Sequence, residues 1–224
     1  MGGVSGERRP RGRPPAGSRP VDDGALLAVA LEAFGDDGFE GTSVRDVCRR
    51  VAVSHNYVHQ RFGSKEDLWF AAVDRAFSEL AADLAAALDP DPGDDVERLR
   101  AVLVRFIELS AASPALLRVM NAEATRPGPR LDHMYDRFIG PAATVIGTVL
   151  RRLERAGRLG TVDPATLHFL VAHGAGAPLS LTGLAAKFGM PARSDPPAVS
   201  RYAHDVVELL LGGMVRAPSR EEPS

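Results

Sequence analysis

The side chains of residues 54–65 could recognise a nucleic acid. This segment reads S-H-N-Y-V-H-Q-R-F-G-S-K, and from Gly41 to Lys65 there are five Lys or Arg residues against one acid, although the whole 224-residue chain has a formal net charge of −2. Asn and Gln side chains can pair bidentately with adenine edges in the major groove of DNA. The alternative is a helical corner with a solvated polar face, but the choice of residues favours nucleic acid.

Short helices are predicted to position these side chains. Ser43 and Asp46 have the spacing of a capping box, in which each side chain bonds the backbone N–H of the other residue, so a helix should begin there. Ser54 is a predicted N-cap of a second helix. Gly63 can adopt the left-handed conformation that ends a helix, and residues 64–67 should cap a third.

The outward face of the second helix is the predicted recognition surface. Val58 and Phe62 are four residues apart and should both point inward, which leaves the polar residues outside. A helix fits into the major groove, while hydroxyl groups and helix N-termini hold phosphates. The predicted DNA contacts in this region are Thr42, Ser43, Arg45, Ser54, His55, Asn56, Tyr57, His59, Gln60 and Lys65.

The segment V-S-H-N-Y-V-H-Q-R-F-G-S-K-E-D-L resembles the signature of the TetR/AcrR family of bacterial one-component regulators. The family usually has Gly before Val-Ser, where this chain has Ala52, and a Leu-Tyr pair where it has Val58 and His59. The resemblance implies an N-terminal three-helix helix-turn-helix domain, residues 21–68. It also implies a C-terminal helical domain for effector binding and dimerisation, residues 69–216.

Residues 1–20 form a basic arm that is predicted to be disordered alone. They contain five Arg, one Glu, four Pro and five Gly, and so offer too little apolar surface to offset the entropy of ordering. The segment around Arg11-Gly12-Arg13 is similar to an AT-hook core, which inserts arginines into a narrow minor groove. The alternative is a solubilising tail, but the position before the helix-turn-helix favours DNA contacts by Arg11 and Arg13. Residues 217–224 are also predicted to be disordered.

The remainder of the chain has helical periodicity, with no long stretch that alternates with period two, so an all-α protein is predicted. A helix break is expected at Gly140-Pro141. An unidentified small-molecule effector would need a mostly apolar pocket with few polar anchors. Candidate pocket residues, each of which could equally be plain core, are Phe106, Met120, Met134, Tyr135, Phe138 and His173.

The last two predicted helices, within residues 168–184 and 199–213, are apolar on nearly every face. Such helices must be buried, either within one subunit or against a partner. The family resemblance favours a homodimer held by a four-helix bundle, which would set two recognition helices about one DNA turn, or a small multiple of it, apart. The predicted interface residues are Leu170, Gly174, Ala177, Leu181, Val206 and Leu210.

Signatures of an enzyme are absent from the sequence. There is no nucleophile elbow, P-loop or dinucleotide-binding glycine pattern. A spacing of five should place His168 and His173 about 140° apart on an α-helix, so no metal pair is expected. No cofactor or metal is predicted. A helical enzyme remains one alternative, and an architectural DNA-binding protein, which would not need the long apolar helical domain, remains another.

The single cysteine, Cys48, excludes an internal disulfide and is predicted to be a small core residue in a reducing cytoplasm. No apolar run reaches the roughly 18 residues of a membrane span, so no membrane partner is expected. These observations predict a cytoplasmic, homodimeric, ligand-responsive transcriptional repressor that binds a palindromic double-stranded DNA operator. A small molecule that prefers the form with badly spaced recognition helices would lower its affinity for DNA.

Overall fold

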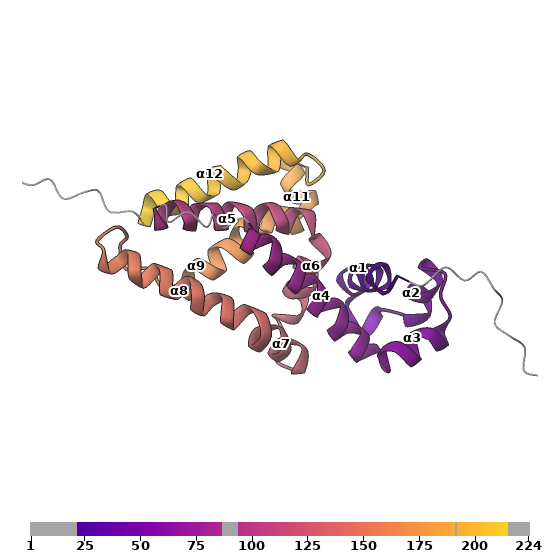
Figure 1. The fold of residues 1–224 in the computed structure, drawn as a ribbon. Coiled ribbons are helices and arrows are strands. Elements are labelled where there is room, and N and C mark those ends of the chain that lie inside the picture. Colours follow the sequence, from indigo (N-terminus) through magenta and orange to yellow (C-terminus); the bar gives the residue numbers. More distant parts are fainter. Residues whose placement is uncertain (1–21, 87–93, 191, 215–224) are drawn as a thin grey trace, which may run out of the picture.

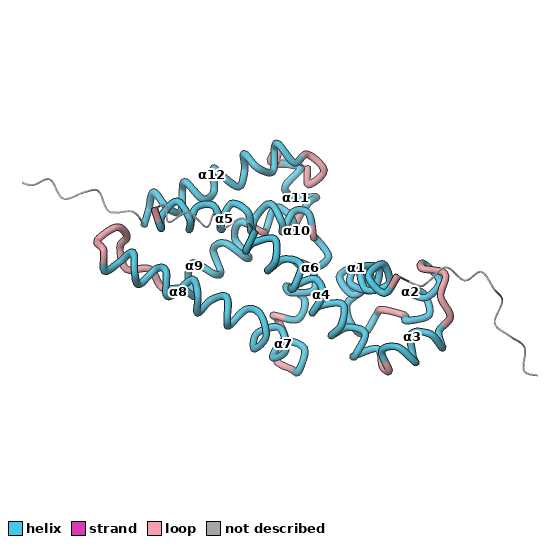
Figure 2. Tube along the Cα trace, viewed as in Figure 1, coloured by secondary structure: helices cyan, strands magenta, loops and turns pink. Residues whose placement is uncertain are grey.

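The computed structural model describes residues 22–86, 94–190 and 192–214. Within these ranges the chain forms helices joined by turns and contains no β-strand (Figure 2), which confirms the predicted all-α class. The molecule is elongated: a small N-terminal domain occupies one end, and the long helix α4 (Lys65–Ala86) leads from it into a larger helical domain (Figure 1). The predicted arm, residues 1–20, and the predicted tail, residues 217–224, lie outside the described residues.

The N-terminal domain contains, before α4, the helices α1 (Asp23–Gly41), α2 (Val44–Arg50) and α3 (His55–Phe62). Asp22 caps α1 by accepting a hydrogen bond from the Gly24 N–H at 2.9 Å. Helix α1 is interrupted at Gly38, whose φ is 70°, and one further turn extends to Gly41.

Capping side chains set the starts of α2 and α4. At α2, the Ser43 hydroxyl accepts from the Asp46 N–H at 3.4 Å. The predicted reciprocal bond is replaced, because the Asp46 carboxylate instead accepts a charge-assisted hydrogen bond from Arg49 at 2.7 Å. A complete capping box is present at α4, where Ser64 and Asp67 bond each other's backbone N–H groups at 3.0 and 3.1 Å.

The core of the N-terminal domain continues into the larger domain. Trp69 on α4 is 1% exposed and packs with Phe34 of α1. Cys48 belongs to this core, as predicted, and its burial raises the pKa of the thiol. Leu116 and Val119 of α6 (Pro114–Glu123) pack into the same cluster. The two domains therefore share packing at the junction of α1, α4 and α6.

The larger domain contains a second core. Its further elements are α5 (Asp95–Ala112), α7 (Pro129–Met134), η1 (Tyr135–Ile139), α8 (Gly140–Arg155), α9 (Pro164–His168), η2 (Phe169–Ala175), α10 (Ala177–Ser180), α11 (Thr182–Lys187) and α12 (Pro196–Met214). Helix α12 lies along α5 (Figure 1) and buries Ala203, Val207 and Leu211 against it. An ion pair between Arg100 and Glu208 joins the same two helices.

The predicted break at Gly140-Pro141 is wrong. Helices α7 and α8 are joined into one run by η1, a π-helical turn in which the Gly140 N–H bonds the carbonyl of Tyr135, five residues earlier. Pro141 has no N–H and its ring clashes with the preceding turn of an α-helix. The wider π turn accommodates both effects, so the helix continues past the proline.

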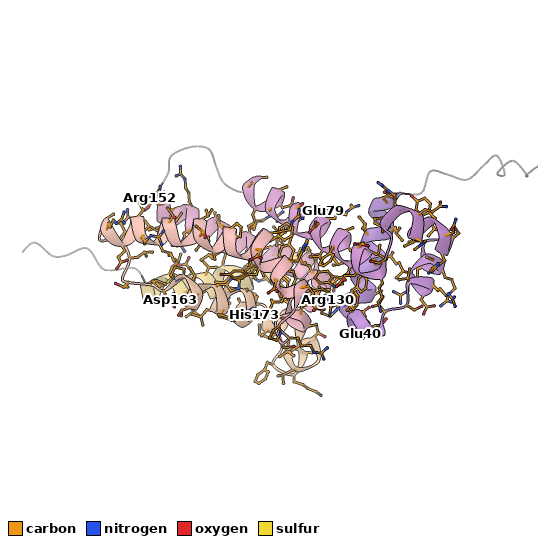
Figure 3. The ribbon with its side chains drawn as sticks, turned by 90° about the horizontal axis from the view of Figure 1, so that it is seen from below. Glu40, Glu79, Arg130, Arg152, Asp163 and His173 are labelled. Atoms are coloured by element: carbon orange, nitrogen blue, oxygen red, sulfur yellow. The ribbon has the colours of Figure 1, made fainter. Side chains whose placement is uncertain are left out.

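The predicted long helix within residues 168–184 is divided. Helix α9 passes into the π-helical η2, after which the chain turns into the short helices α10 and α11. Pro178 stands in the first turn of α10, and the ψ of 50° at Leu181 takes the backbone out of the helical region. As a result, the segment with α10 and α11 projects sideways from the body of the domain (Figure 3).

Candidate nucleic-acid interface and ligand cavity

The face of α3 that points away from the protein is polar and has no carboxylate. Val58 is 3% exposed and anchors the helix in the core, as predicted. His55, Asn56 and Gln60 are exposed. These three side chains offer two amides and an imidazole, which can donate to and accept from the edges of base pairs.

Both ends of α3 are fixed by local hydrogen bonds. The Ser54 hydroxyl accepts from the Tyr57 N–H at 3.1 Å, which confirms the predicted N-cap. Gly63, with φ of 91°, ends the helix. The Nδ1 atom of His59 lies 2.6 Å from the Gly63 carbonyl oxygen. Since a carbonyl only accepts, Nδ1 must hold the hydrogen, and Nε2 is left for a partner outside the protein.

Tyr57 does not belong to the outward face, contrary to the sequence prediction. Its hydroxyl donates to the Asp23 carboxylate at 2.8 Å, and Arg61 donates from Nε to the other oxygen of the same carboxylate at 2.8 Å. The Arg61 hydrogen bond, followed by that of Tyr57, holds the pKa of Asp23 below its ordinary value. Tyr57 and Arg61 thus fasten α3 to the start of α1 and set its orientation.

Thr42 is a second correction to the predicted DNA contacts. It is only 4% exposed. Its hydroxyl lies 3.0 Å from the Ala33 carbonyl and 2.7 Å from the Gly38 carbonyl, where it satisfies the interrupted last turn of α1. A buried hydroxyl used in this way cannot reach a phosphate.

The remaining predicted contacts lie at the surface of the domain. Arg45 on α2 and the cap Ser43 are exposed. Lys65 is half-buried, and its ammonium group donates to the Glu40 carbonyl at 3.2 Å and lies 4.8 Å from the centre of the Phe39 ring. An ammonium group has three donors, so Lys65 keeps hydrogen atoms for a phosphate.

The sequence profile described as "Bacterial regulatory proteins, tetR family" matches residues 26–72, which cover most of this N-terminal domain. The N-terminal domain belongs to the TetR family. The chain is 34% identical over 106 residues to the "HTH-type transcriptional activator FasR" of Mycolicibacterium smegmatis, an alignment that covers 46% of this chain and 48% of that protein. The chain thus spans about half the length of the curated relatives it matches.

Solved structures extend the similarity to the whole fold. The ketosteroid transcriptional regulator KstR2 of Mycobacterium tuberculosis has a TM-score of 0.68 at 19% identity, over 87% of this chain and 95% of that one. The transcriptional regulator FadR from Bacillus subtilis, solved in complex with stearoyl-CoA, has a TM-score of 0.66 at 13% identity, over 86% and 99% of the two chains. At these identities the likeness shows a shared fold.

The turn between α2 and α3 departs from the usual TetR-family sequence at Ala52. The φ of this residue is 55°, the only positive value among the described non-glycine residues. In the left-handed region the Cβ atom approaches the following carbonyl oxygen, at a cost of roughly 1–2 kcal/mol. The glycine that the family usually has here would adopt this conformation freely.

The larger domain contains an apolar cavity of about 430 Å³. Its walls come from α4, α5, α6, η1, α8, α9 and η2, and include Phe77, Leu80, Val102, Ile146 and Leu167. Pockets for small molecules have volumes of about 300–1,000 Å³ and are mostly apolar with a few polar groups. The ionisable side chains of this lining are those of Arg137 and His168, which were not among the predicted pocket residues.

Three of the six predicted pocket residues line this cavity: Phe106, Met120 and Phe138. The other three do not line it. Met134 is completely buried in the first core. Tyr135 is exposed, since the π turn directs it to solvent. His173 bonds the Asn121 side chain through Nδ1 at 2.9 Å and does not reach the cavity surface.

The two histidines of the α9–η2 segment lie closer together than α-helical geometry predicts. The ring centres of His168 and His173 are 5.9 Å apart. A π-helical turn has i→i+5 hydrogen bonds, so residues five apart fall on the same side. Burial, and then the proximity of His173, lower the pKa of His168. No cluster of three or more potential metal ligands occurs in the part of the chain that the structure describes.

Apolar side chains are exposed where the family resemblance predicts a dimer interface. Leu170, Gly174 and Leu181 are exposed, and Ala177, Val206 and Leu210 are partly buried. The sequence missed further exposed apolar residues near them, namely Phe169, Leu184, Phe188 and Leu209. The Tyr202 hydroxyl on α12 donates to the Ala175 carbonyl of η2 at 2.8 Å, so these two elements are neighbours. Among the described helices, none has the length and apolar character needed to span a bilayer.

Arg130, at the start of α7, joins the two domains (Figure 3). Its guanidinium group lies 4.0 Å from the centre of the Phe39 ring in α1 and 3.0 Å from the Glu123 carboxylate in α6. Glu66 of α4 is a more distant partner at 3.9 Å. The sequence gives no signal of this role, because Phe39 and Glu66 are remote from Arg130 along the chain.

Proposed function

We propose that this chain is a cytoplasmic transcriptional repressor of the TetR family that binds a palindromic DNA operator as a homodimer and is released by a small-molecule effector. The acid-free outward face of α3, fixed at both ends and fastened to α1 through Asp23, supports this proposal most directly. A recognition helix must be held rigidly for its side chains to discriminate bases.

Operator binding can be tested with variants of the outward face. Asn56→Ala and Gln60→Ala should each cost about 1–3 kcal/mol on the cognate site if the amide pairs with a base edge. Arg45→Ala should weaken binding to all sequences alike, since a phosphate contact has no sequence preference. The measurement is footprinting and titration on the region upstream of its own gene. A wild-type protein that protects no palindromic segment at moderate salt would end the regulator proposal.

Dimerisation is proposed to use α12 and the neighbouring η2–α11 segment. Leu209 is 79% exposed in the single chain, so Leu209→Glu should leave the subunit fold intact and place a charge in the proposed interface. Sedimentation should show a dimer for the wild type and a monomer for this variant at micromolar concentration. Arg201→Gln changes the charge of an exposed residue elsewhere on α12 and serves as a control. A wild type that sediments as a monomer would contradict the proposal.

The effector is proposed to occupy the apolar cavity bounded by α4, α5 and α8. FadR is named as a complex with stearoyl-CoA and KstR2 as a ketosteroid regulator, and both names point to ligands with large apolar bodies. Helix α4 lines the cavity at its far half and packs in the DNA-binding domain at its near half. A ligand that prefers one position of α4 would therefore change the spacing of the recognition helices.

The arm is proposed to add minor-groove affinity through Arg11 and Arg13, which lie outside the described residues. Deleting residues 1–20 removes five Arg. The slope of log affinity against log salt should shrink by about 0.9 for each phosphate that the truncated protein no longer neutralises, while preference for the operator core survives. Equal slopes for the truncated and full-length proteins would identify the arm as a solvated tail.

A further inference from the structure

The cavity in the larger domain has a mostly apolar lining with one cationic side chain. Nearly all of its lining is hydrocarbon, and its two ionisable side chains are Arg137 from η1 and His168 from α9. His168 is partly buried, and its lowered pKa favours the neutral imidazole near pH 7. The side chain of Arg137 ends in a guanidinium cation. The cavity therefore combines an apolar body with one fixed positive charge.

Arg137 is only loosely engaged by the protein. Its Nη1 atom lies 3.4 Å from the Asp74 carboxylate, and its side chain is 59% exposed. A well-formed charge-assisted N–H···O bond is about 2.7–2.9 Å long, so this pair is weak and open to competition. The guanidinium lies 5.8 Å from the centre of the adjacent Phe138 ring, which itself lines the cavity.

Asp74, the partner of Arg137, has a second and closer contact. The Nε2 atom of His133 donates to its other oxygen at 2.6 Å, and the His133 ring packs against Phe70 at 4.5 Å. Asp74 can therefore lose Arg137 and still have a hydrogen-bond partner. Asp74 is on α4 next to Val73, which is fully buried in the core of the DNA-binding domain.

The same short stretch forms both the cavity wall and the contact between η1 and α4. Phe138 stacks on Phe77 of α4, with ring centres 4.6 Å apart and planes at 5°. Both rings line the cavity. A ligand in the cavity would touch both rings, and Arg137, which also lines the cavity, is the member of the Arg137–Asp74 pair that its head group could contact. The Phe77–Phe138 stack and the Arg137–Asp74 pair both join η1 to α4, so a ligand that contacts Phe138 and Arg137 would act on both contacts.

We propose that the effector is an amphipathic carboxylate, whose hydrocarbon body fills the cavity and whose carboxylate binds Arg137 in competition with Asp74. This inference rests on the proposed role of the cavity as the effector site and names the chemical class of its ligand. An Arg guanidinium binds a carboxylate bidentately, which supplies orientation as well as affinity. Arg137 is then the residue that distinguishes an acid from a neutral molecule of equal length.

The test compares probes that share a chain but differ in head group. Decanoate, 1-decanol and decanoyl-CoA are titrated into the full-length protein by calorimetry, below their micellar concentrations. Decanoate should bind the wild type about tenfold more tightly than 1-decanol, which corresponds to about 1.4 kcal/mol for one charge-assisted contact. Binding of decanoyl-CoA alone would assign the cavity to a carrier-bound acyl chain and overturn the free-carboxylate proposal.

Two variants should shift this preference in opposite directions. Arg137→Gln should abolish the preference for decanoate and leave 1-decanol unchanged, while Arg137→Lys should restore part of it. Asp74→Asn removes the competing charge and keeps an acceptor for His133, so it should raise decanoate affinity severalfold without affecting 1-decanol. Arg155→Gln, an exposed substitution further along α8, is the matched control.

Operator binding by the same proteins distinguishes failure of the carboxylate assignment from failure of the proposed regulatory function. If the wild type and all variants bind the operator, but decanoate and 1-decanol bind alike before and after Arg137→Gln, the carboxylate assignment is overturned and the regulator proposal stands. Failure to bind either probe overturns the assignment too. Failure of the wild type to bind any operator overturns the proposed function itself. Circular dichroism of each variant identifies any that fails to fold.

Discussion

Replacing Arg130 with Met should weaken the junction between the DNA-binding domain and the larger domain. The side chains of Arg130 and Glu123 are 21% and 10% exposed, and their charged groups are 3.0 Å apart. Removing one partner of a fully buried pair costs about 3–5 kcal/mol, because the other charge stays buried and unpaired. The partial exposure of Arg130 reduces this to about 2–3 kcal/mol. Loss of the stacking on Phe39, with its ring centre at 4.0 Å, adds about 1 kcal/mol.

The expected total for Arg130→Met is therefore about 3–4 kcal/mol in the free energy of unfolding, summed from the two terms above. Adding Glu123→Gln to this variant removes the unpaired carboxylate charge. The double variant should therefore be about 2 kcal/mol more stable than the sum of the two single effects predicts. The free energies of unfolding are measured by equilibrium urea denaturation, with the fluorescence of the single tryptophan, Trp69, as the signal. The Trp69 ring centre is 6.0 Å from the Arg130 guanidinium carbon. A cost under about 0.5 kcal/mol, or strict additivity of the two changes, would refute the reasoning, since exposed pairs behave that way.

Three further changes test local features of the fold. Ala52→Gly should stabilise the protein by about 1 kcal/mol, measured as a higher urea midpoint, because it relieves the strain of φ 55°; no change would mean that the turn is unstrained. Thr42→Val leaves the Ala33 and Gly38 carbonyls without their hydroxyl donor and should lower the free energy of unfolding by about 1–2 kcal/mol, measured by the same urea titration. For His168 the folded pKa lies below the unfolded one, so stability is fully present above the unfolded pKa and is lost as pH falls toward the folded pKa. His168→Gln should flatten that loss on acidification below about pH 6.5, and an unchanged pH profile would count against the assignment.

The features that could be predicted from sequence are those set by neighbouring residues. The N-cap at Ser54 and the stop at Gly63 depend on chemistry within a few positions, and the structure has both. The burial of Val58 follows from helical spacing alone. For such features the amino-acid order contains nearly all of the relevant physics, because the interacting groups are separated by one helical turn.

The features that could not be predicted depend on residues that are distant in the chain. Tyr57 was expected to face DNA, but its partner Asp23 is 34 positions earlier, and no local pattern links the two. Arg137 in the cavity and Asp74 on α4 are likewise remote in sequence. The cavity itself exists only once several helical segments are placed around it, and helical periodicity specifies which face is buried without specifying what it faces.

The π turn at Tyr135–Ile139 also sets the rotational phase of everything that follows it. Each residue of an α-helix rotates the side-chain direction by about 100°, so one additional or missing residue in this turn would rotate all of α8 by that angle about its axis. Val145 and Ile146, which line the cavity, would then be displaced from it, and Leu150 and Leu153 would leave the second core. A single-residue deletion here would therefore rotate every side chain that α8 contributes to the cavity and to the second core. The length of this one turn is a stricter requirement on the sequence than the identity of most residues within it.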